Sequence, residues 1–283
     1  NITFDLEADG STQNIQPGEQ MSLKDLLYCI LVASANEACN VVAEYYGGSI
    51  EQFVKLMNDF AAELGCTGTH YANTHGLHND EHYTTARDIA IIAQEGLKHP
   101  LFMEMVNTLT YTTAATNMSQ TRTMQNTNYL ISDMYNGYYS YEYCKGGKTG
   151  RTSKAGYCLM SYAEKDEITL ISVVLGAEEE TIDENRSGAY SFSETKRLFE
   201  WGYENYGYRT IVSTSDMVAE TKVIDGQEAD YVVLHPAKDL QLFLSYDFDT
   251  SAIEKVVRLS SVDGVPAPVN EGDCLGSLDI YLD

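Results

Sequence analysis

The chain has 283 residues, with 18 Lys or Arg against 42 Asp or Glu and a net charge of −24 at pH 7. Such a charge argues against nucleic acid and anionic membrane surfaces as partners. The longest apolar runs, 26–35 and 168–177, are about ten residues long and too short to cross a bilayer. The length suits one large domain or two smaller ones.

The N-terminal part of the chain is predicted to be helical. Residues 24–32 are apolar at most positions and indicate a buried helix, and a second helical pattern covers residues 39–46. A polar break at 34–36 separates the two. Ser49 with Gln52 forms a capping box, which predicts the start of a third helix.

Thr85 and Asp88 form another capping box and predict a helix over residues 86–97. Residues 107–143 are polar and are expected to be strand and loop. Tyrosines without a regular period indicate a partly ordered surface segment there, and the acidic run 178–180 indicates a solvated loop. These tyrosines are Tyr135, Tyr138, Tyr139, Tyr141 and Tyr143.

A β-hairpin is predicted where two apolar runs, 155–163 and 168–176, flank a short polar turn. Lys148 is expected at the start of a strand beside this hairpin. A phosphate-binding loop is excluded, because its first glycine would stand at position 142, which is Glu142.

A last amphipathic helix is predicted over residues 192–203, and short alternating strands with turn signals follow. The chain is therefore expected to be α+β over residues 1–208, with an antiparallel sheet flanked by helices, and to end in a small all-β domain over 209–283. The expected strands span residues 210–213, 231–235, 240–245, 256–259 and 274–282.

Cysteine and histidine usage predicts neither disulfides nor a metal site. The six cysteines are scattered, form no Cys-x-x-Cys pair and mostly lie in apolar runs. Four histidines lie in a polar loop together with Asp80 and Cys66, but they lack the tight paired spacing of zinc ligands, so solvated side chains are favoured. These histidines are His70, His75, His78 and His82.

Two short motifs carry the chemistry. Ser34 and Asn36 stand where a helical pattern breaks, and Lys148-Thr149-Gly150 stands beside the hairpin. A lysine attracts an anionic substrate and holds a serine hydroxyl in a proton relay, whereas an asparagine orients a substrate amide. A threonine hydroxyl can donate to a carboxylate, and a glycine lets an extended peptide add to the strand edge. We therefore expect the two motifs to share one cleft.

The sequence resembles the serine D-alanyl-D-alanine carboxypeptidases, the low-molecular-weight penicillin-binding proteins. The resemblance rests on an ordered set of segments that runs nearly end to end. These segments are LVASANEA at 31–38, NTHGL at 73–77, NTNYL at 126–130, GGKTGRTSKAGYCL at 146–159, RLFEWGYENY at 197–206 and APVNEGDCLGSLDI at 267–280. The resemblance implies a penicillin-binding/β-lactamase-like catalytic domain and an accessory β domain.

By this resemblance, Ser34 and Asn36 form the family's Ser-x-Asn motif and Lys148 begins its Lys-Thr-Gly motif. Thr149 and Gly150 then bind substrate, and the backbone N–H of Arg151 completes an oxyanion hole. Relatives often carry a substrate-binding arginine at the place of Ser191. Arg186, five residues earlier, is a candidate to replace it.

The family's first motif, Ser-x-x-Lys, is expected well upstream of Ser34. Only Ser193 and Lys196 form such a spacing in this chain, on a predicted helix after the third motif, and we interpret them as a chance match. The chain is therefore expected to begin inside its catalytic domain, with nucleophile and base upstream of Asn1. The 283 residues alone are expected to be inactive.

The leading interpretation is a bacterial serine-type D-Ala-D-Ala carboxypeptidase that works outside the cytoplasmic membrane or is secreted. Its expected partners are peptidoglycan pentapeptides ending in D-Ala-D-Ala and β-lactam antibiotics, with no metal or organic cofactor and a membrane anchor possible outside the chain. Two alternatives stay open: a class A β-lactamase-like hydrolase, and a non-catalytic cell-wall-binding module.

Overall fold

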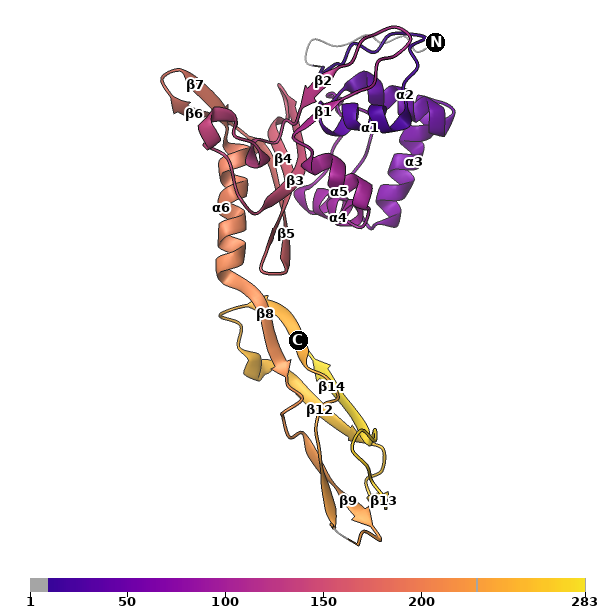
Figure 1. Ribbon diagram of the computed structural model, residues 1–283, viewed down its shortest axis with the longest axis vertical. Coiled ribbons are helices and arrows are strands. Elements are labelled where there is room, and N and C mark those ends of the chain that lie inside the picture. The colour runs from indigo at the N-terminus through magenta and orange to yellow at the C-terminus, as the bar shows by residue number, and fades with distance from the viewer. Residues whose placement is uncertain (1–9, 228, 283) are drawn as a thin grey trace. The chain divides into compact units, whose positions relative to one another are not determined.

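A computed structural model describes residues 10–227 and 229–282 (Figure 1). The chain divides into two compact units, Asn1–Gly202 and Tyr203–Asp283. The α-helices are α1 (Leu23–Leu31), α2 (Asn36–Gly47), α3 (Ile50–Glu63), α4 (Ala86–Gly96), α5 (Pro100–Asn107) and α6 (Tyr190–Asn205). Short 3-10 turns are η1 (Tyr129–Ile131), η2 (Met134–Gly137) and η3 (Thr250–Ala252).

The strands of the first unit are β1 (Thr110–Thr112), β2 (Thr123–Gln125), β3 (Cys144–Thr152), β4 (Gly156–Lys165), β5 (Ile168–Ala177), β6 (Glu179–Asp183) and β7 (Arg186–Ala189). The strands that follow α6 are β8 (Tyr206–Val212), β9 (Ala219–Ile224), β10 (Tyr231–Leu234), β11 (Leu240–Ser245), β12 (Glu254–Leu259), β13 (Val265–Pro266) and β14 (Gly276–Tyr281). The α+β prediction is confirmed.

The predicted helix starts are confirmed by their caps. Ser49 Oγ accepts a hydrogen bond from the Gln52 N–H at 3.2 Å, and Thr85 Oγ1 accepts one from the Asp88 N–H at 3.1 Å. Each side chain satisfies a backbone donor that the first helical turn leaves unpaired. Helix α5 was not predicted, because its eight residues are too few for a clear period.

An antiparallel sheet of order β3-β4-β5 forms the centre of the first unit. The predicted hairpin is β4–β5, and its turn residues Asp166 and Glu167 have φ of 49° and 65°, as hairpin turns that match the strand twist require. The strand that carries Lys148 begins at Cys144, so the Lys-Thr-Gly motif lies in its second half and not at its start.

The first half of β3 packs against other backbone, and this requires glycine. A Cβ on Gly146 would lie 2.5 Å from the Val106 carbonyl oxygen at the end of α5, and one on Gly147 would lie 2.2 Å from the Met160 carbonyl oxygen on β4. These contacts hold β3 closely between α5 and β4, which fixes the position of the motif that follows.

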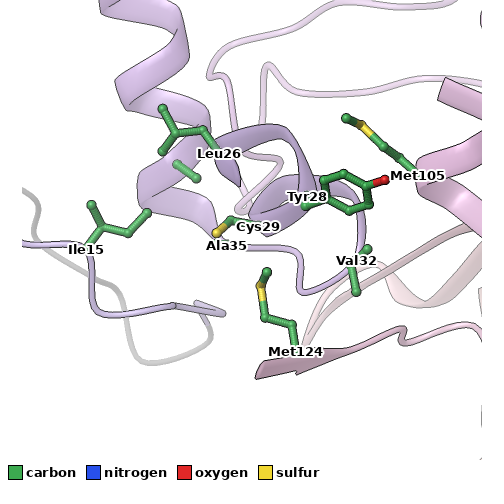
Figure 2. Packing of buried hydrophobic residues seen from close by; sticks show 9 residues of the cluster. Ile15, Leu26, Tyr28, Cys29, Val32, Ala35, Met105 and Met124 are labelled. Atoms are coloured by element: carbon green, nitrogen blue, oxygen red, sulfur yellow. The ribbon is translucent and has the colours of Figure 1, made fainter. Parts of the chain in front are cut away.

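A buried cluster lies behind the junction of α1 and α2. Cys29 and Val32 have no exposed surface, and Met105 of α5 and Met124 of β2 pack against this cluster (Figure 2). Tyr28 joins it by stacking on Tyr111 with ring centroids 3.6 Å apart. The cluster ties the end of α1 to α5 and to β2.

Both surface predictions were wrong in part: Tyr139, Tyr141 and Glu180 are buried, whereas Tyr138, Glu178 and Glu179 are exposed. Tyr139 is 2% exposed and packs on Phe192 with ring centroids 5.0 Å apart. Its hydroxyl donates to Glu180 at 2.9 Å, and Glu180 is only 6% exposed. Tyrosine can be buried when its hydroxyl finds a partner, and composition does not reveal that partner.

The second unit consists mainly of antiparallel ribbons, β8–β11 and β12–β14, together with a three-stranded sheet of order β10-β9-β13. Its core joins the inner faces of the two ribbons. Buried Ile211 of β8 and Leu244 of β11 lie in one cluster with Leu278 and Ile280 of β14. The strands β9 and β13 were not predicted.

Candidate active site

A cavity of about 650 Å³ lies between the α1–α2 junction, the loop 74–77, the second half of β3 and the start of α6. Ser34, Asn36 and Lys148 all line it. None of the described lining residues is Asp or Glu, although the chain carries a net charge of −24. The lining includes two cationic side chains, Lys148 and Arg151. The cavity therefore suits an anionic ligand.

Ser34 has a backbone conformation that non-glycine residues seldom adopt, with φ of 59°. The chain reverses here between two helices. The N–H of Ser34 donates to the Ile30 carbonyl at 3.1 Å, and the N–H of Ala35 donates to the Cys29 carbonyl at 2.9 Å. These bonds close the end of α1, where carbonyls would otherwise stay unpaired. The resulting turn holds Ser34 at the cavity wall.

Asn36 starts α2 and is 8% exposed. Its N–H donates to the Ser11 carbonyl at 2.9 Å. The next residue, Glu37, accepts from the Thr12 hydroxyl at 2.8 Å and from the Gln13 N–H at 2.7 Å. The segment that begins at Ser11 therefore packs against the start of α2 and keeps Asn36 in the wall.

Lys148 connects the two motifs. Its Nζ donates to Ser34 Oγ at 2.8 Å and to the Thr149 carbonyl at 2.7 Å. Burial lowers the pKa of the Lys148 ammonium to about 8, and the Cys39 thiol partly offsets this shift. An ammonium has three donors, so two stay inside the wall and a third remains for a ligand.

The end of β3 forms an open edge. Because the sheet order is β3-β4-β5, one side of β3 has no strand partner among the described residues. Gly150 is exposed there, and an added Cβ would meet nothing closer than Cys158 Cβ at 3.8 Å. Thr149 shares a hydrogen bond with the Thr127 hydroxyl. An extended peptide can add to this edge by backbone hydrogen bonds.

The family model for D-alanyl-D-alanine carboxypeptidase matches residues 3–179, which include both motifs. The chain belongs to this carboxypeptidase family. A curated relative is D-alanyl-D-alanine carboxypeptidase DacF of Bacillus subtilis, 31% identical over 97% of this chain. The chain spans 66% of DacF, and 62% of DacC of Escherichia coli, so it covers less than two thirds of either protein.

Solved structures agree with this assignment. Penicillin binding protein 5 of Haemophilus influenzae has a TM-score of 0.64 and 25% identity, over 98% of this chain and 74% of that chain. A peptidoglycan synthesis regulatory factor, PBP3 of Streptococcus pneumoniae, has a TM-score of 0.63 and 26% identity, over 90% and 69%. The penicillin-binding fold predicted from the motifs is confirmed.

The two candidate substrate-binding arginines, Arg151 and Arg186, differ in their position relative to the cavity. Arg151 lines the cavity, and its guanidinium lies 4.8 Å from the ring centroid of Tyr157. Arg186 is not among the described lining residues, and it binds Asp183 at 2.7 Å and the Tyr135 carbonyl at 3.2 Å. The structure therefore places Arg151 in the same cavity lining as Lys148 and leaves Arg186 on the β6–β7 hairpin.

The second Ser-x-x-Lys spacing also lies apart from the cavity lining. Ser193 donates to Glu180 within the buried tyrosine network, and neither Ser193 nor Lys196 lines the cavity in the described residues. No group of three metal-binding side chains occurs in residues 10–227 and 229–282. In the same ranges, no helix combines the length and apolar character needed to cross a membrane.

Several lining residues were not predicted, among them Tyr157, Thr127 and His75. Tyr157 faces Arg151 across the β3–β4 pair, and Thr127 bonds Thr149. His75 lines the cavity, and its Nδ1 accepts from the Leu77 N–H at 3.2 Å. The segments that hold Thr127 and His75 were both part of the quoted resemblance, so their position in that ordered set was the available signal.

Proposed function

We propose that the protein that carries this chain is a serine-type D-Ala-D-Ala carboxypeptidase, which cleaves peptidoglycan stem peptides through an acyl-enzyme and is acylated by β-lactams. The observation that carries the proposal is the 2.8 Å bond from Lys148 Nζ to Ser34 Oγ, inside a cavity whose described lining has no carboxylate. Positive charge in such a cavity attracts a peptide that ends in a carboxylate.

The Ser34–Lys148 pair suits a proton relay. Because Lys148 Nζ donates to Ser34 Oγ, the serine keeps its own proton to donate onward into the cavity. When a nucleophilic serine attacks the peptide carbonyl, the leaving amine of the terminal D-alanine must gain a proton, and Ser34 can supply it. The nucleophile itself is expected in the Ser-x-x-Lys motif, so the described residues supply the relay and the substrate contacts.

The test is acylation of the intact protein by a fluorescent penicillin, together with D-alanine release from an acylated D-Ala-D-Ala peptide. Lys148→Ala should lower acylation about 100-fold or more and leave the melting temperature nearly unchanged. The matched control is Lys154→Ala, since Lys154 is exposed and does not line the cavity. Equal acylation of Lys148→Ala and parent would remove Lys148 from the site.

The same assays separate the alternatives. Turnover of penicillin without release of D-alanine would favour a β-lactamase-like hydrolase, and peptide binding without either reaction would favour a wall-binding module. The 283-residue chain alone should gain no mass from penicillin, because its described cavity lining holds no Ser-x-x-Lys serine. An adduct on Ser34 or Ser193 would overturn the roles given to both.

Acylation should also depend on pH through Lys148. Its pKa is lowered to about 8 by burial, so the ammonium that attracts an anion is present below that pH and is lost as the pH rises through it. Rates for an anionic β-lactam should fall above pH 8. A flat profile from pH 7 to pH 10 would contradict an anion-binding role for Lys148.

The proposed function also implies where the protein acts. DacF of Bacillus subtilis and DacC of Escherichia coli are carboxypeptidases of bacteria. An extracytoplasmic place of action, in the cell envelope or after secretion, follows from a peptidoglycan substrate. We assign the chemistry to residues 1–208 and an accessory role to the β domain 209–283.

A further inference from the structure

We infer that Arg151 binds the free terminal carboxylate of the peptide, and so makes this site specific for a chain end over an internal bond. The inference rests on the proposed function. It assigns to the Arg151 side chain a role separate from the backbone N–H of the same residue.

The position of Arg151 on β3 supports this role. Thr149 and Arg151 are two residues apart on β3, so their side chains lie on the same face of that strand. Both line the cavity, and Gly150 between them leaves the backbone uncovered. A peptide that adds to this edge would therefore place its last carboxylate beside a hydroxyl and a guanidinium.

The position of the guanidinium against Tyr157 also supports this role. It lies 4.8 Å from the centroid of the Tyr157 ring, and Tyr157 is the register partner of Arg151 on the central strand β4. Stacking on an aromatic face restricts the guanidinium while leaving its edge N–H groups available. No ion pair or side-chain hydrogen bond engages this guanidinium within the described ranges, in contrast to Arg186, which is bound to Asp183. Arg151 is therefore positioned by an aromatic contact but is not neutralised by a carboxylate of the described residues.

The charges of the cavity lining support this role as well. Of the two cations in the described lining, Lys148 directs two of its donors to Ser34 and to the Thr149 carbonyl. Helix α6 contributes Ser191 and Phe192, which carry no charge. Arg151 is thus the group best suited to a planar, bidentate contact with a carboxylate.

The test measures dissociation constants of two probes for the 283-residue chain by NMR titration: an acylated D-Ala-D-Ala peptide and its C-terminal amide. The parent should bind the carboxylate about tenfold more tightly than the amide. Arg151→Gln should abolish this preference without weakening amide binding. Arg151→Lys should retain part of it, because a point charge lacks the planar fork. Tyr157→Leu removes only the aromatic surface beside the guanidinium. It should therefore reduce the preference for the carboxylate probe less than Arg151→Gln does.

The matched control is Lys154→Gln. Lys154 lies three residues after Arg151, is exposed and is not among the described lining residues, so this change removes one positive charge outside the cavity. Lys154→Gln should keep the parent's preference for the carboxylate over the amide, because we attribute that preference to Arg151 and not to a general attraction between positive charge and an anion. An undiminished preference in Arg151→Gln would overturn the inference while leaving the proposed function intact. A folded parent that binds neither probe would overturn the proposed function, and the inference with it.

Discussion

The two segments that form the candidate site are built in opposite ways. The α1–α2 junction puts Ser34 in a left-handed conformation, with φ of 59°, and is held by polar contacts from the segment 11–15. The β3 strand instead uses glycines that let its backbone touch α5 and β4 directly. One wall of the site therefore depends on a strained backbone and hydrogen bonds, whereas the other depends on the absence of side chains.

The largest effect is expected on β3. Gly146→Ala would place a Cβ 2.5 Å from the Val106 carbonyl oxygen at a φ of 131°, so overlap and backbone strain add. The free energy of unfolding should fall by about 4 kcal/mol, or the protein should fail to fold. Chemical denaturation measures this loss.

Gly150→Ala is the matched control on the same strand. Its Cβ would meet Cys158 Cβ at 3.8 Å, an ordinary contact, so stability should change by less than about 0.5 kcal/mol. Peptide binding at the strand edge should still weaken, because the added methyl occupies the open surface. Equal destabilisation by the two changes would contradict the glycine-packing account of β3.

The junction should instead be sensitive to acid. Glu19 follows the segment that holds the junction and fastens it to residues 116–122. It pairs with Arg122 at 2.8 Å and accepts a hydrogen bond from Thr116, and its side chain is fully buried. Hydrogen bonding by Arg122 lowers the pKa of Glu19 to about 2. Arg122→Met should cost about 3 kcal/mol at neutral pH, because it leaves a buried carboxylate without its partner.

The sign of the pH effect follows from the lowered pKa. The Glu19–Arg122 pair stabilises the fold fully above the ordinary carboxyl pKa of 4.5, and this contribution is lost as the pH falls toward 2. The difference in unfolding free energy between parent and Arg122→Met should therefore shrink below pH 4.5. A difference that stays constant down to pH 2.5 would show that the carboxylate is not the cause.

The smallest effect concerns strain at Ser34. Ser34→Gly should be more stable than Ser34→Ala by about 1 kcal/mol, because glycine adopts a positive φ without the Cβ penalty. Both variants lose the hydroxyl that Lys148 bonds, so both should lose the relay equally. Urea denaturation of Ser34→Gly and Ser34→Ala measures this difference in the free energy of unfolding. Equal stabilities of the two variants would mean that the junction stores no backbone strain.

Much of the local structure could be predicted from sequence. The caps at Ser49 and Thr85 and the hairpin β4–β5 depend on residues close together in the chain, so their patterns were visible. The short helix α5 and the strands β9 and β13 have too few residues to show a period. The ordered motifs, and no single one of them, were enough to indicate the family.

What the sequence determined by itself was therefore the family, the mixed architecture and the pairing of Ser34 with Lys148 as residues of one cleft. Only the tertiary structure decided which charges face that cleft. Arg151 and Arg186 are equally charged in sequence, yet one stacks on Tyr157 at the cavity and the other pairs with Asp183. Likewise, Tyr139 and Glu180 are buried because each satisfies the other. Such choices depend on partners far away in the chain, because burial and pairing are set by packing and not by local pattern.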